Sequence, residues 1–244
     1  MPLTVPTQEG LRRRESLTPA VSTPPLRNGD VLGREEFERR YHGEPHCKKA
    51  ELIQGRVYVP SPLSIQGHAR PHAELGTWLG NYYMATPGTL IAGNGTVRLD
   101  DRNEPQPDLV LTTDPDCGGR ARLGPDDYFE GGPEWIAEIA GSSAGVDLHE
   151  KHETYAAHGV GEYVVWRTED RELDWFVLHE GQYVLQEPDP DGVYRSRQFP
   201  GLWLDPQALL NRDFERLLQV LGQGLASPEH TAFLEELARR RGAP

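Results

Sequence analysis

The sequence predicts a mixed α/β fold built on a central sheet that is flanked by helices. Three observations support this fold class. The run PEWIAEIA is strongly apolar and predicts a buried central strand. Residues 66–86 and 146–158 carry signals of helices, and short strand-like segments lie between and after them. The chain after residue 204 shows helix-start signals and no strand pattern, which predicts extra C-terminal helices.

The N-terminal part begins with residues for which we expect no ordered structure. Residues 1–30 are rich in Pro, Ser, Thr and charge without periodicity, which is typical of a disordered arm. REEFERRYHG then predicts a short helix that ends at Gly43. AELIQGRVYVP alternates around Gln54-Gly55 and predicts a β-hairpin with a tight turn. A core helix over residues 66–86 completes this part.

The middle of the chain is predicted to supply the sheet, and we assign residues 31–204 to this domain. Short strands are expected at TLIAG, TVRLD, DLVLTT and PEWIAEIA. After the helix that stops at Gly159, further strands are expected at GEYVVWRT, LDWFVLHEG and QYVLQEP, with RSRQFPGLWLD as a candidate for one more. The Gly- and Asp-rich span from Asp114 to Gly132 is long enough to be a functional loop or an insertion.

Residues 205–244 are predicted to form a C-terminal helical extension. Asp205-Pro206 and Ser227-Pro228 each pair an N-cap residue with proline at the first helical position. These two signals predict two helices.

Composition restricts the compartment and the partners. No stretch approaches the roughly 20 apolar residues that span a bilayer, and the N-terminus lacks the apolar core of a secretory signal, so we expect a cytoplasmic protein without membrane contact. Cys47 and Cys117 are too few for a disulfide framework or a Cys-based zinc site. The net charge of −13 counts against broad nucleic-acid binding, but it allows a nuclease because a metal-binding carboxylate cluster is itself acidic.

Two carboxylates are notable because each lies in an apolar run. Asp108 opens PDLVLTT, and Glu138 lies within EWIAEIAG. A buried carboxylate needs a cation, a donor or a solvent cleft. If the two strands pair, both acids can face one Mg²⁺ ion, which prefers a few carboxylates together with water and substrate phosphate. The structural alternative is a buried ion pair with an arginine such as Arg98.

Lys151 lies on the predicted helix that follows, and spacing alone leaves its role open. Asp147, Lys151 and Tyr155 are four residues apart, so they share one helix face. Lys151 could form a surface ion pair with Asp147, worth a few tenths of a kcal/mol. It could instead point into a cleft beside Glu138 and stabilise the charge of a phosphate transition state.

Other acidic and histidine residues carry weaker signals. Glu51 opens the predicted hairpin, where an exposed strand position is the simplest interpretation. His68 and His72 are four residues apart and could bind zinc. No further ligand pattern such as HExxH accompanies them, so a helix-capping or cleft-lining role is favoured.

The order of these motifs resembles a family of nucleases. ELIQGRVYVPSP, His68, QPDLVL and EIAGSSAGVDLHEKHETYAAHGVGEYVVW are similar to the Uma-type "putative restriction endonucleases", a branch of the PD-(D/E)xK nuclease superfamily. The similarity runs from about Arg34 to Phe199. It implies a restriction-endonuclease-like core with a central mixed sheet, a site for Mg²⁺ or Mn²⁺, and hydrolysis of DNA phosphodiester bonds.

The resemblance also implies roles for the candidate residues. Asp108 and Glu138 would hold the metal, Glu51 would be a third acid in the same cleft, and Lys151 would be the catalytic lysine, with His68 and Tyr155 as supporting residues behind them. In the common arrangement the lysine lies two residues after the second acid, and Ala140 occupies that position here. The similarity to the Uma-type pattern implies that the lysine has moved to the helix.

Two other functions stay open from the sequence. The chain could be a non-catalytic binding or regulatory module that keeps the nuclease fold. It could also be a glycosidase that uses Glu138 with Asp108, which requires a separation of roughly 5–9.5 Å between the carboxyl groups. For the nuclease, DNA is the expected partner, and homodimer formation is left open.

Overall fold

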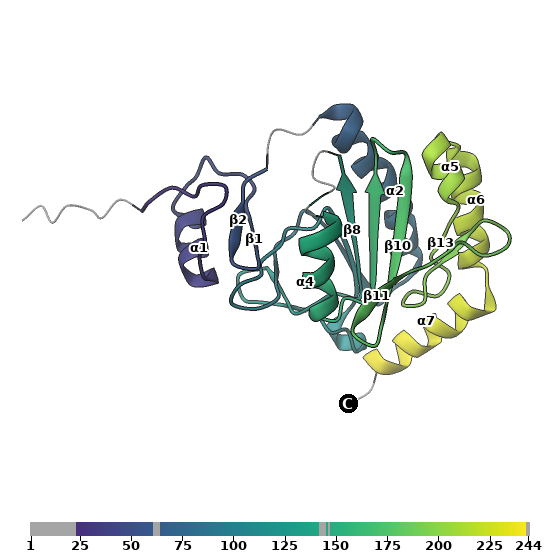
Figure 1. Cartoon of the computed structure of the whole chain (residues 1–244). Coiled ribbons are helices and arrows are strands. Elements are labelled where there is room, and N and C mark those ends of the chain that lie inside the picture. Colours follow the sequence, from purple (N-terminus) through teal and green to yellow (C-terminus); the bar gives the residue numbers. More distant parts are fainter. Residues whose placement is uncertain (1–22, 61–63, 142–144, 146, 243–244) are drawn as a thin grey trace, which may run out of the picture.

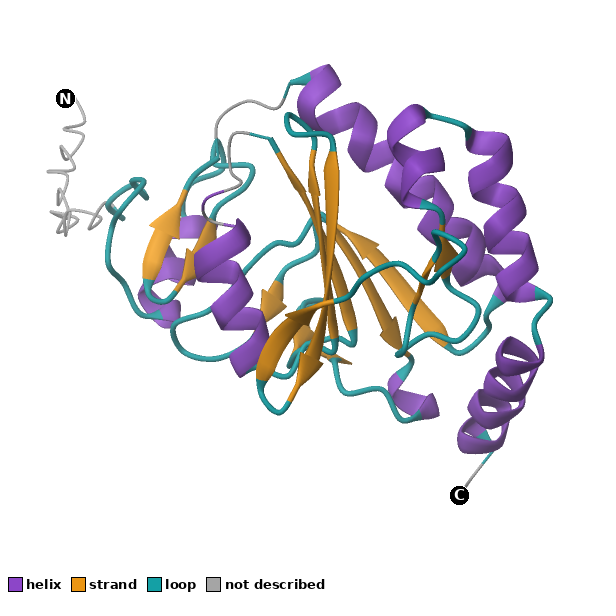
Figure 2. Cartoon of the chain, turned by 45° about the vertical axis from the view of Figure 1, so that its right-hand side comes forward, coloured by secondary structure: helices purple, strands orange, loops and turns teal. Residues whose placement is uncertain are grey.

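The protein is built around a six-stranded mixed sheet. The computed structural model describes residues 23–60, 64–141, 145 and 147–242 (Figure 1). The strand order is β11-β10-β9-β8-β5-β3. These strands are β3 (Thr89–Gly93), β5 (Leu109–Thr113), β8 (Trp135–Ala140), β9 (Glu162–Arg167), β10 (Glu172–His179) and β11 (Gln182–Leu185). Helices lie on both sides of the sheet (Figure 2), so the predicted fold class is confirmed.

Strand β8 is the buried centre of this sheet. All six of its residues are buried, as the apolar run PEWIAEIA predicts. It pairs in parallel with β9 and antiparallel with β5. Because side chains alternate across a strand, β8 sends Trp135 and Ile139 to one face and Ile136 and Glu138 to the other.

One face of the sheet is covered by three helices. They are α2 (Arg70–Ala85), α5 (Pro206–Asn211) and α6 (Phe214–Leu225). The shared core is rich in aromatic rings, and Trp135 lies 6.3 Å from Trp78 and 6.1 Å from Trp175 between ring centroids. A short π-turn, η1 (Ile65–Ala69), leads into α2. The predicted core helix is therefore confirmed, with its first turns wider than an α-helix.

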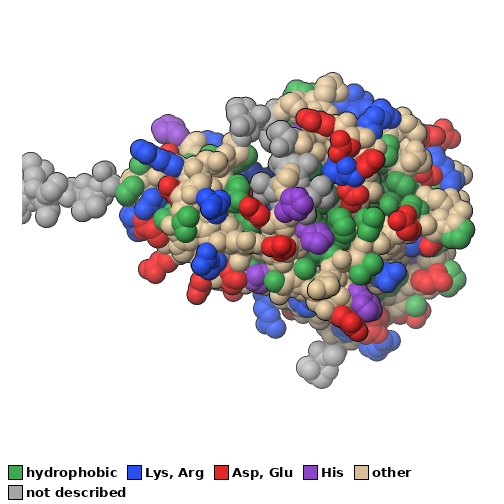
Figure 3. Space-filling model, in the orientation of Figure 1, with side chains coloured by type: hydrophobic (Ala, Val, Ile, Leu, Met, Phe, Trp, Pro, Cys, Tyr) green, Lys and Arg blue, Asp and Glu red, His purple; other side chains and the backbone are tan. Residues whose placement is uncertain are grey.

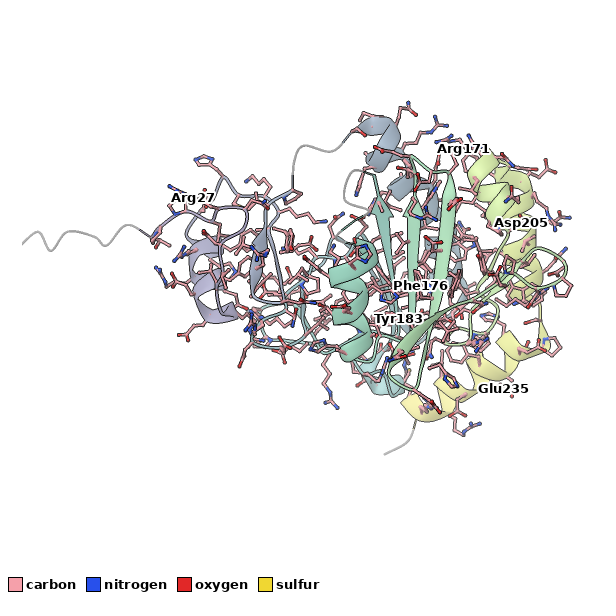
Figure 4. All side chains as sticks on the ribbon, in the orientation of Figure 1. Arg27, Arg171, Phe176, Tyr183, Asp205 and Glu235 are labelled. Atoms are coloured by element: carbon pink, nitrogen blue, oxygen red, sulfur yellow. The ribbon has the colours of Figure 1, made fainter. Side chains whose placement is uncertain are left out.

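The opposite face is covered by α4 (His152–Ala157) and by a small second sheet. That sheet has the order β4-β7-β6 and comprises β4 (Val97–Arg98), β6 (Arg122–Leu123) and β7 (Phe129–Glu130). Figure 4 labels Phe176 and Tyr183, which lie beside α4 with ring centroids 6.2 Å apart. The span from Asp114 to Gly132, expected to be a functional loop or an insertion, contains β6, β7 and the 3₁₀ turn η2 (Pro115–Cys117).

The N-terminal elements form a small layer with a core of its own. It comprises α1 (Arg34–His42) and the hairpin of β1 (Glu51–Ile53) and β2 (Arg56–Tyr58), at one end of the molecule (Figure 1). The predicted hairpin is confirmed, and its turn places Gln54 and Gly55 at φ 51° and 78°. The separate core contains Leu26, Phe37, Ala50, Leu52 and Val57.

The C-terminal extension has three helices where two were predicted. α5 ends at Asn211, and Arg212 adopts φ 58°, which breaks the helix. The Asp213 side chain then accepts a hydrogen bond from the backbone N–H of Arg216 and begins α6. α7 (Pro228–Arg241) follows, capped by Ser227 as expected.

The remaining segments are short. The predicted arm falls largely outside the described residues, and residues 23–30 contain no helix or strand. RSRQFPGLWLD contributes to the two-residue strands β12 (Tyr194–Arg195) and β13 (Trp203–Leu204). In the described part of the chain, every helix is too short or too polar to cross a membrane.

Candidate active site

The register of the sheet brings the two predicted metal ligands together. β5 and β8 pair with Leu109 opposite Ala137. One step further along this antiparallel register, Asp108 lies opposite Glu138. The backbone N–H of Ile139 donates to Asp108 Oδ2 at 2.8 Å, which ties the two strands at this point. Asp108 and Glu138 are both buried, with side chains 3% exposed.

Glu138 is contacted by two residues of the helical segment over it. Lys151 is the last residue of the π-turn η3 (Asp147–Lys151), and α4 continues from it. Lys151 Nζ lies 2.9 Å from Glu138 Oε1, and the Tyr155 hydroxyl donates to the same oxygen at 2.9 Å. The shared helix face predicted for Lys151 and Tyr155 therefore points at Glu138. The interpretation of Lys151 as a surface residue is wrong, because its side chain is 4% exposed; the side chain of Asp147 lies outside the described residues.

Glu51 completes this cluster from the hairpin layer. Its Oε1 lies 3.0 Å from Lys151 Nζ, and it accepts a hydrogen bond from the backbone N–H of Gln106 at 2.7 Å. The interpretation of Glu51 as an exposed strand residue is wrong, since the residue is 7% exposed. The ammonium of Lys151 thus bridges carboxylates from two separate layers of the molecule.

Asp108 has cationic and donor groups of its own. His68 Nε2 lies 3.0 Å from Asp108 Oδ2, and Lys49 Nζ lies 3.5 Å from Asp108 Oδ1. Burial alone would raise the pKa of Asp108, but the hydrogen bond with His68 and the charge of Lys49 outweigh it and hold that pKa well below its usual value. Asp108 is therefore an anion at neutral pH.

The structure also decides between earlier alternatives for nearby residues. Arg98 does not pair with Asp108 or Glu138 but with Glu38 at 2.6 Å and Asp126 at 2.5 Å. His72 Nε2 lies 2.8 Å from the backbone oxygen of Asp108, so His72 lines the site rather than capping a helix.

The sequence did not point to two contributors to the site. Lys49 is one of two adjacent lysines in a connecting segment, and nothing in KKAELIQG separates it from Lys48. Gln106 was seen only as part of QPDLVL, yet its backbone N–H holds Glu51 and its side-chain amide donates to the Thr96 hydroxyl at 3.2 Å. The arrangement of both residues depends on tertiary contacts.

The donor chemistry of the site fits a hard divalent cation. In this cluster of described residues three carboxylates, of Glu51, Asp108 and Glu138, face two ammonium groups, of Lys49 and Lys151. Asp108 Oδ1 is buried and makes no hydrogen bond with a described residue. Among the described residues, no group of three or more His, Cys, Asp or Glu side chains is placed so that it could hold a metal ion. Mg²⁺ does not require one, because it binds through one or two carboxylates and keeps several waters.

Comparison with known protein families agrees with this architecture. The family model Uma2, described as "Putative restriction endonuclease", matches residues 34–207. The match covers most of the chain and contains every residue of the site. The protein therefore belongs to the Uma2 family. No curated protein matches its sequence significantly.

A solved structure shares the fold. It is described as a putative nuclease belonging to DUF820 from Anabaena variabilis ATCC 29413. The TM-score is 0.55 with 12% sequence identity, and the alignment covers 74% of this chain and 98% of that one. At this identity the similarity establishes the fold alone.

Proposed function

We propose that the protein is a divalent-metal-dependent endonuclease that hydrolyses DNA phosphodiester bonds at the Asp108–Glu138 site. The observation that carries this proposal is the position of Asp108 opposite Glu138 on paired strands, with the Lys151 ammonium on Glu138. Membership of the family supports the reaction class. It also favours a nuclease over a glycosidase.

Asp108 and Glu138 would hold the metal, which we expect to be Mg²⁺ or Mn²⁺. A bound divalent ion supplies Lewis-acid stabilisation of phosphate charge and lowers the pKa of a bound water. His68 and the N–H of Ile139 occupy Asp108 Oδ2 and leave Oδ1 as the oxygen without a hydrogen bond. The lowered pKa of Asp108 keeps this ligand ionised at neutral pH.

Lys151 would stabilise the charge that develops on the phosphate. Glu138 and Glu51 hold its ammonium from two sides, so its position is set before substrate arrives. Preorganised charge in a dry site is more effective than the same charge in water. Tyr155 restrains Glu138 through its hydroxyl, and Glu51 restrains Lys151.

The test is nicking of supercoiled plasmid DNA with Mg²⁺ or Mn²⁺, with EDTA as the metal-free arm. Wild type should nick only with metal, and Asp108→Asn and Glu138→Gln should each lose activity by at least about a hundredfold, since charge-stabilising groups in active sites are worth that much or more. Glu162→Gln is the matched control, because Glu162 is equally buried on the opposite face of the sheet. Full activity in Asp108→Asn, or equal nicking in EDTA, would contradict the proposal.

A non-catalytic binding module is the second candidate. The observation that favours it is burial: Glu51, Asp108, Glu138 and Lys151 are each at most 9% exposed. Calorimetric titration with Mn²⁺ separates the two candidates. The nuclease predicts binding that is lost in Asp108→Asn, whereas the binding module predicts no uptake of metal in either protein.

A further inference from the structure

The site contains two lysines whose surroundings differ. The Lys151 side chain is 4% exposed, and its ammonium lies 2.9 Å from Glu138 and 3.0 Å from Glu51. The Lys49 side chain is 21% exposed, and its ammonium lies 3.5 Å from Asp108 Oδ1. This separation is longer than a charge-assisted hydrogen bond, which is about 2.7–2.9 Å. Lys49 is therefore the more accessible and more loosely paired of the two cations.

The position of Lys49 is set by groups that also hold Asp108. Lys49 Nζ donates to Asn94 Oδ1 at 3.1 Å. The backbone N–H of Asn94 in turn donates to the backbone oxygen of Asp108 at 3.1 Å. Asn94 has φ 55°, a left-handed conformation that asparagine tolerates better than most residues. This turn therefore keeps the ammonium of Lys49 beside the carboxylate of Asp108.

Lys49 retains capacity to bind an anion. An ammonium has three N–H donors. Among the described residues, Lys49 uses one donor on Asn94 and faces Asp108 at ion-pair distance only. A phosphate oxygen that reaches the exposed part of the Lys49 side chain, which is 21% exposed, can accept a hydrogen bond from this ammonium. Lys49 also precedes Glu51 by two residues, so one short segment supplies both a buried acid and an accessible cation.

We propose that Lys49 binds a phosphate oxygen of the DNA substrate at the entrance to the site, as a substrate-binding residue distinct from Lys151. This inference rests on the proposed nuclease function and assigns a residue that the family motifs do not include. The two lysines then have different roles. Lys49 binds a phosphate of the substrate, and the buried Lys151 stabilises the charge of the transition state.

The experiment compares Lys49→Ala, Lys49→Arg and Lys48→Ala with wild type. Lys48 is the matched control, because it is adjacent, exposed, and donates to the backbone oxygen of Pro45. Binding of a short fluorescent DNA duplex is measured in EDTA over a range of salt concentrations. Steady-state nicking of plasmid DNA with Mg²⁺ gives kcat and KM for each protein.

Lys49→Ala should raise Kd and KM by about tenfold or more, as expected for a hydrogen bond to a charged group, and should change kcat by a smaller factor than KM. The slope of log affinity against log salt should become shallower by about 0.9, which corresponds to one lost phosphate contact. Lys49→Arg should restore the slope, and Lys48→Ala should behave as wild type.

Three outcomes would overturn the proposal. If Lys49→Ala matches Lys48→Ala in Kd, KM and salt slope while wild type cleaves DNA, the role of Lys49 is wrong and the nuclease function stands. If Lys49→Ala lowers kcat without changing KM or the slope, Lys49 acts through the charge of Asp108 rather than on the phosphate. If wild type neither binds nor cleaves DNA, the proposed function fails first and this inference fails with it.

Discussion

Two buried carboxyl groups on opposite faces of the sheet, of Glu162 and Asp108, have pKa values shifted in opposite directions. Glu162 begins β9 on the face covered by α2, α5 and α6, and it is fully buried. Its partners are the Ser196 hydroxyl at 2.6 Å and the backbone N–H of Arg197 at 2.5 Å. Burial raises the pKa of Glu162 to about 7 in spite of these donors. Asp108, buried almost as deeply at the other face, has its pKa lowered by His68 and Lys49.

The difference shows that burial alone does not decide the charge of an acid in this protein. Neutral donors leave Glu162 close to protonation at neutral pH, whereas neighbouring cations keep Asp108 ionised. Of these two described carboxyl groups, the one that neighbouring cations keep ionised, Asp108, lies on the face with Glu138 and Lys151. On the face of the molecule shown in Figure 3, acidic and basic side chains are interspersed.

The largest expected effect tests the charged face. Lys151→Met removes the ammonium from Glu138 and Glu51 and leaves both carboxylates buried. We expect a loss of about 3–5 kcal/mol in the free energy of unfolding, measured by urea denaturation at neutral pH. Adding Glu138→Gln should recover part of this loss, because it removes the charge of one of the two carboxylates that Lys151 contacts. If Lys151→Met has the free energy of unfolding of wild type, the pairing of Lys151 with Glu138 and Glu51 does not stabilise the folded protein.

A second prediction uses the residue next to Glu138 on the same strand. Ile139 points to the apolar face and is 1% exposed. Ile139→Ala should lower the free energy of unfolding by about 2–4 kcal/mol through the cavity it leaves. Its backbone N–H still donates to Asp108, so Mn²⁺ affinity of the folded protein should be unchanged by calorimetry. Loss of metal affinity in this variant would mean that the two faces are not independent.

The smallest effect concerns pH. The pKa of Glu162 is about 7 in the folded state and near 4.5 in an unfolded chain, so the folded state binds more protons between these values. The free energy of unfolding should therefore fall as pH rises from about 4.5 to 7, by on the order of 2 kcal/mol.

Glu162→Gln should flatten this part of the stability curve, measured by urea denaturation across the pH range. Ile139→Ala serves as the control and should keep the wild-type slope. An unchanged slope in Glu162→Gln would assign the pH dependence to another group.

Local signals in the sequence were sufficient for most of the fold. PEWIAEIA has the length and apolarity of a buried strand, and Gln54-Gly55 lies between alternating residues at hairpin spacing. The break between α5 and α6 was missed because Arg212 is an ordinary helix former by propensity, and its left-handed conformation has no local signal. Packing of α6 against α2 and the sheet decides that break, and packing is not visible in a short window of sequence.

A site residue could be predicted from the sequence where its residue type is unusual for the surrounding segment, and not where it is common there. Glu138 could be found because a carboxylate in an apolar strand needs a partner. The spacing of Lys151 and Tyr155 placed them on one face but did not show which way that face points. Glu51 required the family resemblance, because an acid at the start of a hairpin is ordinary. Lys49 could not be separated from Lys48 without the fold.

The position of Lys151 at the end of η3, directly before α4, also affects the stage of folding at which the site is assembled. On the common strand position, now Ala140, a lysine would accompany its acid as soon as the strand formed. Here the acids and the lysine come from the hairpin, β5, β8 and the helical segment, which lie up to 100 residues apart between Glu51 and Lys151. A partly folded chain does not bring these residues together, so under the proposed function hydrolysis requires the hairpin, β5, β8 and the helical segment to be packed against one another.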